Sequence, residues 1–391
     1  MESESKSEHE PQPLNATKEL HAHISGSIDP SSICDLIYQN DLHLQHRDRL
    51  NSITEPFGIR LADAITNNLF YAKENFSSVY TCPPNGENRF NEVMQRFNLT
   101  SSLLQLPGIK SDFGELVCKT FKEQGIEYVE WRVDPFSSTQ NETADEALEK
   151  LSEYYSGMQK VDLDSRFILS LSRARYTNNS GGIDYVKLEF LNNQTEDLLR
   201  YKEDLPIIGI DVSNAEVVPL SVFKDVFDLG QSYGLGTVPH VGKGTNPTLE
   251  EGLDDVQTAL SLPSNRLGHA IVAYSSLDDY LGRRDVRGDI YDRSRIERLK
   301  ARQLETLQQI RENDVAIEVC PTSNLCAHLG LRTFDQHPID RLAEMRIPFV
   351  ICSDDPGIFG RSLQEETEGI TQAKGLPKTQ IIENANRRLL A

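Results

Sequence analysis

The fold is decided by the segment KELHAH at residues 18–23, a short strand-like run that ends in His21 and His23. Side chains two residues apart in an extended segment point to the same side, so the two imidazoles can approach one metal ion. Taken alone the pair is weak evidence, because polar residues often end a strand. Its meaning depends on what stands at the ends of the other strands.

Seven further runs of this kind follow along the chain. They are short and rich in Val and Ile, and most are nearly continuous in hydrophobicity, which is typical of strands buried on both faces. With the first run, the predicted strands are Lys18–His23, Ile126–Val133, Arg166–Ser172, Pro206–Val212, Thr237–Val241, Asn265–Ala270, Val315–Cys320 and Pro348–Cys352.

Amphipathic stretches between these runs predict helices, among them Asp112–Gln124, Ala144–Met158 and Ser294–Glu312. Ser294 and Glu297 have the spacing of a capping box, which indicates that the third helix starts there. Repeated strand-helix units predict a parallel sheet, and eight of them predict an α/β fold with a (β/α)8 TIM barrel.

The spacing of the runs predicts one domain with an insertion. About 100 residues separate the first run from the second, which is too long for a single crossover. The segment 31–108 is therefore expected to place extra helices over one mouth of the barrel. Residues 1–16 are polar without an apolar period, as expected of a disordered tail, and residues 17–391 are expected to form the barrel.

Composition narrows the possible partners. The 391 residues include 60 acidic and 40 basic ones, for a formal net charge of −20. Nucleic-acid polymers and anionic membranes are bound by basic surfaces, so neither is an expected partner. No apolar run reaches the ~18 residues of a membrane span, and the N-terminus lacks the apolar core of a secretory signal. Six cysteines are a low density here, which favours buried thiols in a reducing compartment and a cytoplasmic protein.

Three more predicted strands end in groups that can bind a metal. His240 ends the fifth strand, His269 ends the sixth, and Asp354 and Asp355 follow the eighth. The active face of a barrel lies at the C-terminal ends of its strands, so these groups are expected to meet the histidine pair of the first strand. Histidines with a carboxylate suit Zn²⁺, which activates water near neutral pH. The joint pattern predicts a metal-dependent hydrolase.

Each of these groups also has an ordinary interpretation by itself. A strand-end histidine is more often a hydrogen-bonded structural residue, and Asp-Asp before Pro is usual in turns and helix N-caps. Residues 242–245, Gly-Lys-Gly-Thr, do not form a phosphate loop, because Thr237 and Gly244 stand where that loop needs Gly and Ser or Thr. Cys320 and Cys326 lack the spacing of a zinc knuckle.

Six segments carry a family resemblance: ELHAHISGS (19–27), GIEYVEWR (125–132), GID (209–211), RLGH (266–269), EVCPTSN (318–324) and SDDPGIF (353–359). They resemble the adenosine deaminase family of the amidohydrolase superfamily, and most closely its adenosine deaminase-like, N6-methyl-AMP deaminase branch. They follow the family's order from residue 18 to residue 360, and the CPTSN and SDDP motifs are specific to the family in combination.

The resemblance implies one zinc ion per chain, bound by His21, His23, His240 and Asp354. It also implies a TIM barrel, in agreement with the strand pattern.

The resemblance further implies that His269 orients a metal-bound hydroxide and that Asp355 positions it and moves its proton. The reaction would be attack of that hydroxide on C6 of a 6-aminopurine nucleoside or nucleotide, such as adenosine, AMP or N6-methyl-AMP, with loss of ammonia or an alkylamine. The partner would then be a small molecule, and a monomer is favoured over an oligomer.

Three positions depart from the family pattern. Active members have His-x-Gly-Glu after the fifth strand, and that glutamate protonates the purine ring; here Lys243 stands in its place. Asn214 replaces a glycine that contacts the purine. Ser25 replaces an aspartate that touches the ribose 5′ oxygen in free-adenosine deaminases, and the loss of its charge makes a 5′-phosphate more tolerable. Lys243 is therefore expected to be a catalytic group together with His269 and Asp355, and Ser25, Asn214 and Gly242 are expected substrate contacts.

Two alternatives stay open beside the purine deaminase. One is a related barrel hydrolase with a changed substrate, in which Lys243 contacts an anionic or carbonyl group. The other is a non-catalytic relative that binds a nucleoside or a metal. Glu250 and Glu251 lie seven and eight residues downstream of Lys243 and are not expected to replace the family glutamate.

Overall fold

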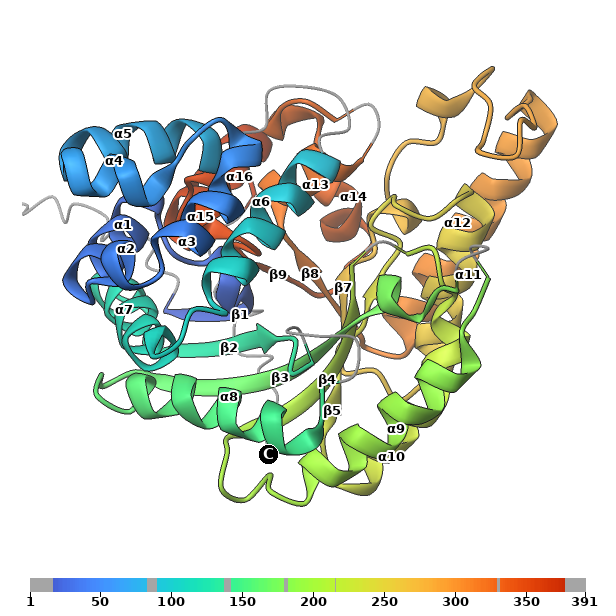
Figure 1. Ribbon diagram of the computed structural model, residues 1–391. Helices are drawn as coiled ribbons and strands as arrows, with labels where there is room; N and C mark the ends of the chain where they lie inside the picture. The colour runs from blue at the N-terminus through green and yellow to red at the C-terminus, as the bar shows by residue number, and fades with distance from the viewer. Residues whose placement is uncertain are drawn as a thin grey trace, which may run out of the picture.

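The computed structural model describes residues 17–82, 90–136, 142–178, 182–214, 216–328 and 331–376, so the tail expected at 1–16 lies outside the described residues. Within these ranges strands and helices alternate along the chain (Figure 1). The strands are β1 (Lys18–His23), β2 (Tyr128–Val133), β3 (Asp164–Ser172), β4 (Ile207–Ser213), β5 (Gly236–Thr237), β6 (His240–Val241), β7 (Arg266–His269), β8 (Ala316–Val319) and β9 (Phe349–Ile351).

The strands form the (β/α)8 barrel that the sequence predicts. Their ladders are parallel and run in the orders β1-β2-β3-β4-β5 and β6-β7-β8-β9. The last strand returns to the first: the backbone N–H of His23 donates to the carbonyl of Asp354 at 2.8 Å, and that of Asp354 donates to the carbonyl of His21 at 2.9 Å. Because β5 and β6 together occupy one place between β4 and β7, the described strands fill eight positions around the barrel.

The fifth predicted strand, Thr237–Val241, is interrupted at Val238-Pro239, so its predicted continuity is wrong. Proline has no N–H to donate to a ladder, which breaks regular pairing at that point. The segment before the break pairs with β4 and the segment after it pairs with β7. His240 therefore begins its own short strand at the mouth of the barrel.

The strands read as continuous apolar runs because both of their faces are covered. Every residue of β2 and of β4 is buried. Trp131 packs outward against Phe121 of the helix that precedes β2, with ring centroids 4.7 Å apart. Because side chains alternate along β2, Glu130 and Arg132 point into the barrel. There Glu130 pairs with Arg266, and Arg132 pairs with Asp211.

Helices surround the strands and form the outer layer of the molecule (Figure 1). Those that follow β2 and later strands are α8 (Ala144–Met158), α9 (Tyr185–Leu199), α10 (Lys224–Ser232), α11 (Leu249–Ser261), α12 (Arg293–Glu312), α13 (Pro321–Ala327), α14 (Ile339–Glu344), α15 (Pro356–Phe359) and α16 (Leu363–Lys374).

The long segment between β1 and β2 is helical. It contains α1 (Pro30–Gln39), α2 (Leu42–Gln45), α3 (Arg47–Thr54), α4 (Leu61–Asn67), α5 (Leu69–Tyr80), α6 (Phe90–Leu103) and α7 (Ile109–Glu123). Helix α6 packs against the turn after β1 and against α13 and α15, which follow β8 and β9, so it lies over the C-terminal ends of these strands. The assignment of residues 17–391 to one domain stays a prediction.

The start of α12 corrects one prediction. The helix begins at Arg293, and its cap is Asp292, whose carboxylate accepts the N–H of Arg295 at 2.7 Å. Ser294 therefore lies inside the first turn and is not the cap, because the aspartate two residues earlier already satisfies the free N–H. Among the described helices, none has the length and apolar character that a membrane crossing requires.

Candidate active site

Five side chains from four strand ends converge at the C-terminal mouth of the barrel. His21 and His23 come from β1, His240 from β6, His269 from β7, and Asp354 from the residues after β9. One ligand atom from each of His21, His240, His269 and Asp354 lies within 4.8 Å of the others, and all four residues are buried. The Nε2 of His23 lies 3.2 Å from the Nε2 of His240 and 3.3 Å from an oxygen of Asp354.

Two buried carboxylates orient two of these histidines. The Nδ1 of His21 donates to Glu318 of β8 at 2.7 Å, and the Nδ1 of His240 donates to Asp211 of β4 at 2.9 Å. Burial by itself raises the pKa of Glu318, but the charges of nearby arginines and the His21 hydrogen bond hold it below its ordinary value. Both Nε2 atoms then carry a lone pair and point to the centre of the cluster.

The donor set fits a zinc ion. Among the described residues, the Nε2 of His21, the Nε2 of His269 and the Oδ1 of Asp354 are buried without a hydrogen-bond partner, which is costly unless a cation binds them. The Nε2 of His23 lies 3.2 Å from the Nε2 of His240 and 3.3 Å from Oδ1 of Asp354, and the Nε2 of His21 lies 3.5 Å from the same oxygen. Tetrahedral zinc with bonds of about 2.0 Å separates its ligand atoms by about 3.3 Å.

His269 is held by a chain of hydrogen bonds behind it. Its Nδ1 lies 3.1 Å from Oδ1 of Asn324, and the amide nitrogen of Asn324 lies 3.0 Å from Nε2 of His337. With the amide oxygen accepting from Nδ1, the Nε2 of His269 keeps its lone pair and faces Asp354 at 3.7 Å. His269 has a φ of +61°, a left-handed conformation that costs a non-glycine residue energy and is common at functional sites.

Asp355 lies beside this cluster in a place that only glycine leaves open. A Cβ on Gly26 would lie 1.8 Å from Oδ1 of Asp355. Burial raises the pKa of Asp355 well above its ordinary value, and the neighbouring charge of Asp354 raises it further. Asp355 is thus a carboxyl group able to hold a proton next to the donor cluster.

Lys243 reaches into the same cluster. Its ammonium Nζ donates to Oδ2 of Asp354 at 3.1 Å, and its side chain is only 11% exposed. Burial alone lowers the pKa of Lys243, but the charges of Asp354 and Asp355 outweigh burial and raise it. The side chain at the position of the family glutamate is therefore a charged donor.

Glu216 supports the loop that carries Lys243 and was not found by the sequence reasoning. The backbone N–H of Lys243 donates to its two oxygens at 3.2 and 3.0 Å, and the hydroxyl of Thr245 donates at 3.1 Å. Burial raises the pKa of Glu216. Nothing in its local sequence marks it, because its partners lie about thirty residues downstream.

Asp211 and Glu318 lie in two of the segments that carry the family resemblance, and the sequence predicted no role for either. Both are acids inside apolar strand runs, and such residues are almost never fully buried unless they are paired. That pattern was the available signal for the two residues that orient His21 and His240.

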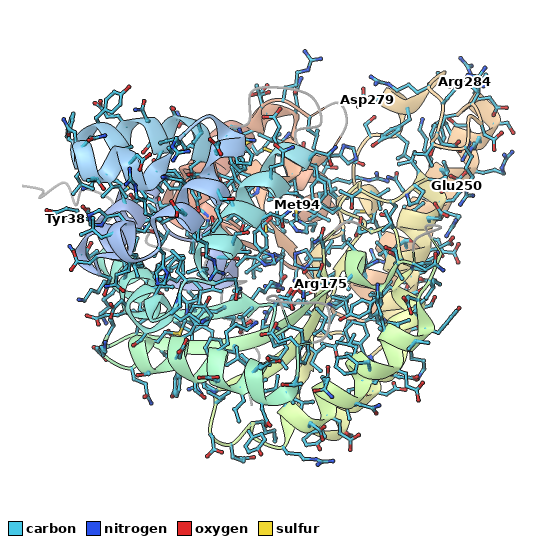
Figure 2. The ribbon with its side chains drawn as sticks, viewed as in Figure 1. Tyr38, Met94, Arg175, Glu250, Asp279 and Arg284 are labelled. Carbon is cyan, nitrogen blue, oxygen red and sulfur yellow. The ribbon has the colours of Figure 1, made fainter. Side chains whose placement is uncertain are left out.

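A cavity of about 500 Å³ opens above the cluster. Its floor includes His23, His240, Lys243, Asp354 and Asp355. Its walls include Phe90, Val93, Met94, Phe97 and Asn98 of α6, with Lys150, Arg175, Ser172 and Ser213 on other sides. Figure 2 labels Met94 on α6 and Arg175 below it, both in the central part of the view.

The three predicted substrate contacts have different places. Ser25 and Asn214 line the cavity. Asn214 has a φ of +77°, which glycine and asparagine tolerate best, and its amide donates to Ser172 at 2.9 Å. Gly242 is not among the described residues that line the cavity. Its φ is +55°, and a Cβ there would lie 2.5 Å from the side chain of Val272, so packing requires the glycine.

Glu250 and Glu251 lie away from the cavity, as the sequence suggested. Glu250 accepts two hydrogen bonds from Arg295 at 2.7 and 2.9 Å, and Glu251 pairs with Arg287. In Figure 2, Glu250 stands toward the outer side of the molecule, away from Met94 and Arg175. Neither glutamate replaces the carboxyl group that is missing at position 243.

Comparison with known proteins agrees with this geometry. The family model described as adenosine deaminase matches residues 74–388. The chain is 24% identical to an adenosine deaminase of Clostridium acetobutylicum over 360 residues, covering 89% of this chain and 84% of that protein. It is 24% identical to the N6-methyl-AMP deaminase of Bos taurus over 370 residues, covering 93% and 85%. An Arabidopsis adenosine deaminase-like protein crystallised with IMP shares the fold, with a TM-score of 0.62, 19% identity and coverage of 96% and 91%. This chain therefore belongs to the adenosine deaminase family and is a hydrolytic deaminase.

Proposed function

We propose that this protein is a zinc-dependent deaminase that removes ammonia or an alkylamine from C6 of a purine nucleotide of the AMP or N6-methyl-AMP type. The observation that carries the proposal is the convergence of the histidine Nε2 atoms on Asp354, with the Nδ1 atoms of His21 and His240 tied to carboxylates. Such orientation is typical of metal-binding histidines.

One zinc ion per chain would be held by His21, His23, His240 and Asp354. When bound, the ion lowers the pKa of a water molecule, so that a nucleophile is available at neutral pH. His269 is assigned a different role because the other three histidines and Asp354 already supply four ligands, and Asn324 leaves the Nε2 of His269 as an acceptor beside them. There it accepts a hydrogen bond from the attacking water and orients it.

Asp355 moves the proton of the water. Its carboxyl lies next to Asp354, and burial raises its pKa, which suits a group that must take up and release a proton. The amine that leaves C6 needs that proton. Because Gly26 has no side chain, Oδ1 of Asp355 can occupy this position.

Lys243 donates a hydrogen bond to the purine ring nitrogen next to C6. Charge develops on that nitrogen when water adds to C6, and a fixed ammonium stabilises it. Unlike the family glutamate, the lysine carries its positive charge before and after the substrate binds. The lysine therefore favours a purine ring nitrogen that accepts a hydrogen bond over one that takes up a proton completely.

The cavity supports a nucleotide as substrate. Its 500 Å³ fit a ligand of nucleotide size, and Ser25 adds no negative charge near the expected ribose. Arg175 and Lys150 line the same cavity, and a plant relative was crystallised with IMP. We further infer a monomeric, cytoplasmic enzyme; all six cysteines are buried, which suits a reducing compartment.

Product assays test the proposal. Purified zinc-loaded protein is incubated with adenosine, AMP and N6-methyl-AMP, and ammonia, methylamine and the 6-oxopurine products are measured. Turnover of AMP or N6-methyl-AMP is expected to exceed that of adenosine, and Asp355→Asn is expected to retain zinc and lose turnover. Absence of product from all three compounds, with one zinc bound, would contradict the proposal and favour a binding protein.

A second candidate rests on the ion pair between Lys243 and Asp354. Here the enzyme is a hydrolase whose substrate offers a carbonyl or anionic group to the ammonium instead of a purine nitrogen. The variant Lys243→Glu separates the two candidates. If wild type is inactive on the purines and the variant gains AMP deamination, the changed-substrate hydrolase is favoured.

A further inference from the structure

Arg132 lies inside the barrel, beneath the donor cluster, and contacts three strands at once. It comes from β2 and is 1% exposed. Its Nε donates to Oδ2 of Asp211 on β4 at 3.1 Å, its Nη2 donates to Oε2 of Glu318 on β8 at 2.5 Å, and its Nη1 donates to the carbonyl of Leu20 on β1 at 3.0 Å. One guanidinium therefore joins elements from opposite parts of the barrel.

The two carboxylates that Arg132 contacts are those that orient histidines. Oε2 of Glu318 also accepts from Nδ1 of His21 at 2.7 Å, and the other oxygen of Asp211 accepts from Nδ1 of His240 at 2.9 Å. The result is a continuous chain from His21 through Glu318, Arg132 and Asp211 to His240. The guanidinium fork supplies separate N–H groups in one plane, which a lysine ammonium cannot reproduce.

We propose that Arg132 is a positioning residue that sets the orientation of His21 and His240 together, and thereby the affinity of the metal site. The inference rests on the proposed zinc site and adds that its two most buried histidines are coupled through one side chain. Moving the guanidinium moves both carboxylates, and each carboxylate fixes the ring of one histidine. Partners of this kind change metal affinity by about 10- to 100-fold when they are removed.

Arg266 provides a matched control. It is also 1% exposed and lies in the same network, where it donates to Oε1 of Glu318 at 2.7 Å and pairs with Glu130. Its contacts with Glu318 and Glu130 thus include one histidine-orienting carboxylate, whereas those of Arg132 with Asp211 and Glu318 include both. The substitutions Arg132→Lys and Arg266→Lys keep charge and approximate size and remove the fork at two comparable buried sites.

The experiment measures metal binding by the full chain rather than turnover. Zinc affinity is determined by competition with a chromophoric chelator, the visible spectrum is recorded with Co²⁺ in place of zinc, and thermal melting is followed for every variant without metal. Arg132→Lys is expected to weaken zinc binding about 10- to 100-fold and to alter the Co²⁺ spectrum. Arg266→Lys is expected to lose similar thermal stability with less than about a threefold change in zinc affinity.

Equal weakening by the two variants would overturn the proposal, because it would show a general effect on the buried network. An Arg132→Lys variant with wild-type affinity and spectrum would overturn it as well. If Arg132→Lys does not fold, Arg132→Gln is compared with Arg266→Gln by the same measurements. If wild type binds no zinc, the metal site itself fails, whereas zinc bound with unchanged affinity in the Arg132 variants refutes only the role of Arg132.

Discussion

The ammonium of Lys243 lies 3.1 Å from Oδ2 of Asp354, a carboxylate whose other oxygen faces His21 and His23. Asp354 thus accepts a hydrogen bond from the ammonium through one carboxylate oxygen and faces two histidines with the other. The contact brings the side chain that departs from the family pattern to the atoms where the chemistry is proposed. In the proposed function, a lysine and a metal ion would share this one carboxylate.

Replacing Lys243 by methionine is expected to separate turnover from metal binding. The variant removes the donor to the purine ring, and loss of such a group lowers kcat by about 10²- to 10⁴-fold. It also removes a positive charge beside Asp354, so zinc affinity is expected to stay the same or rise. Steady-state kinetics and zinc titration check both. The exposed Lys224→Met is the control, and unchanged kcat in Lys243→Met would contradict the proposed role.

Substitution of Gly26 by alanine is expected to displace Asp355 without removing any ligand. The new Cβ would lie 1.8 Å from Oδ1 of Asp355, so the carboxyl must turn away. A loss of about 10²-fold in kcat is expected, since a misplaced proton-transfer group costs that much. Zinc content, measured by elemental analysis, should stay near one per chain. Asp355→Asn should match the kinetic defect; retention of full activity by Gly26→Ala would show that Asp355 does not need this position.

Removal of zinc is expected to lower the melting temperature of the wild type. A ligand at 1,000 times its Kd stabilises the folded state by about 4 kcal/mol, and a chelator removes that contribution. The His21→Ala/His23→Ala double variant should contain no zinc and should melt at the same temperature with and without chelator. Scanning calorimetry with elemental analysis checks this. Full zinc occupancy in the double variant would refute the ligand assignment.

Stability is expected to depend on pH through Glu366, on α16. Its side chain accepts the backbone N–H of Thr322 at 3.1 Å, and burial raises its pKa from 4.5 to about 7. Between these values the folded state holds a proton that the unfolded state has lost, so the contribution of Glu366 falls as pH rises from about 4.5 to 7. The full effect is about 3 kcal/mol. Denaturation of wild type and Glu366→Gln across this range should show a flatter pH dependence in the variant; parallel curves would contradict the prediction.

Much of the fold could be predicted because its signals are local. The run at 18–23 coincides with β1, and seven of the eight predicted strands correspond to single strands within two residues at each end. The exception, Thr237–Val241, contains Pro239, whose missing N–H interrupts the ladder. The predicted start of α12 at Ser294 differs from the observed start at Arg293. A capping-box spacing occurs at Ser294 by coincidence, whereas Asp292 makes the cap.

The candidate site could be predicted only in part. Histidines and an aspartate at strand ends meet because parallel strands in a barrel place their C-termini at one mouth. Glu216 was missed because its role is to accept a backbone N–H and a hydroxyl from a loop distant in the sequence. Gly242 is required by close packing against Val272 and is not among the described residues that line the cavity. Neither property leaves a trace in the neighbouring residues.

The sequence by itself determined the barrel, the family and the ring of candidate metal ligands, because apolar period and strand-end chemistry are carried by residues close together in the chain. Only the tertiary structure decided what those groups touch. Lys243 and Asp354 are separated by 111 positions, and Arg132 and Glu318 by 186, yet each pair is in contact. Such contacts arise when the barrel closes and buried charges must find partners, which no local pattern specifies.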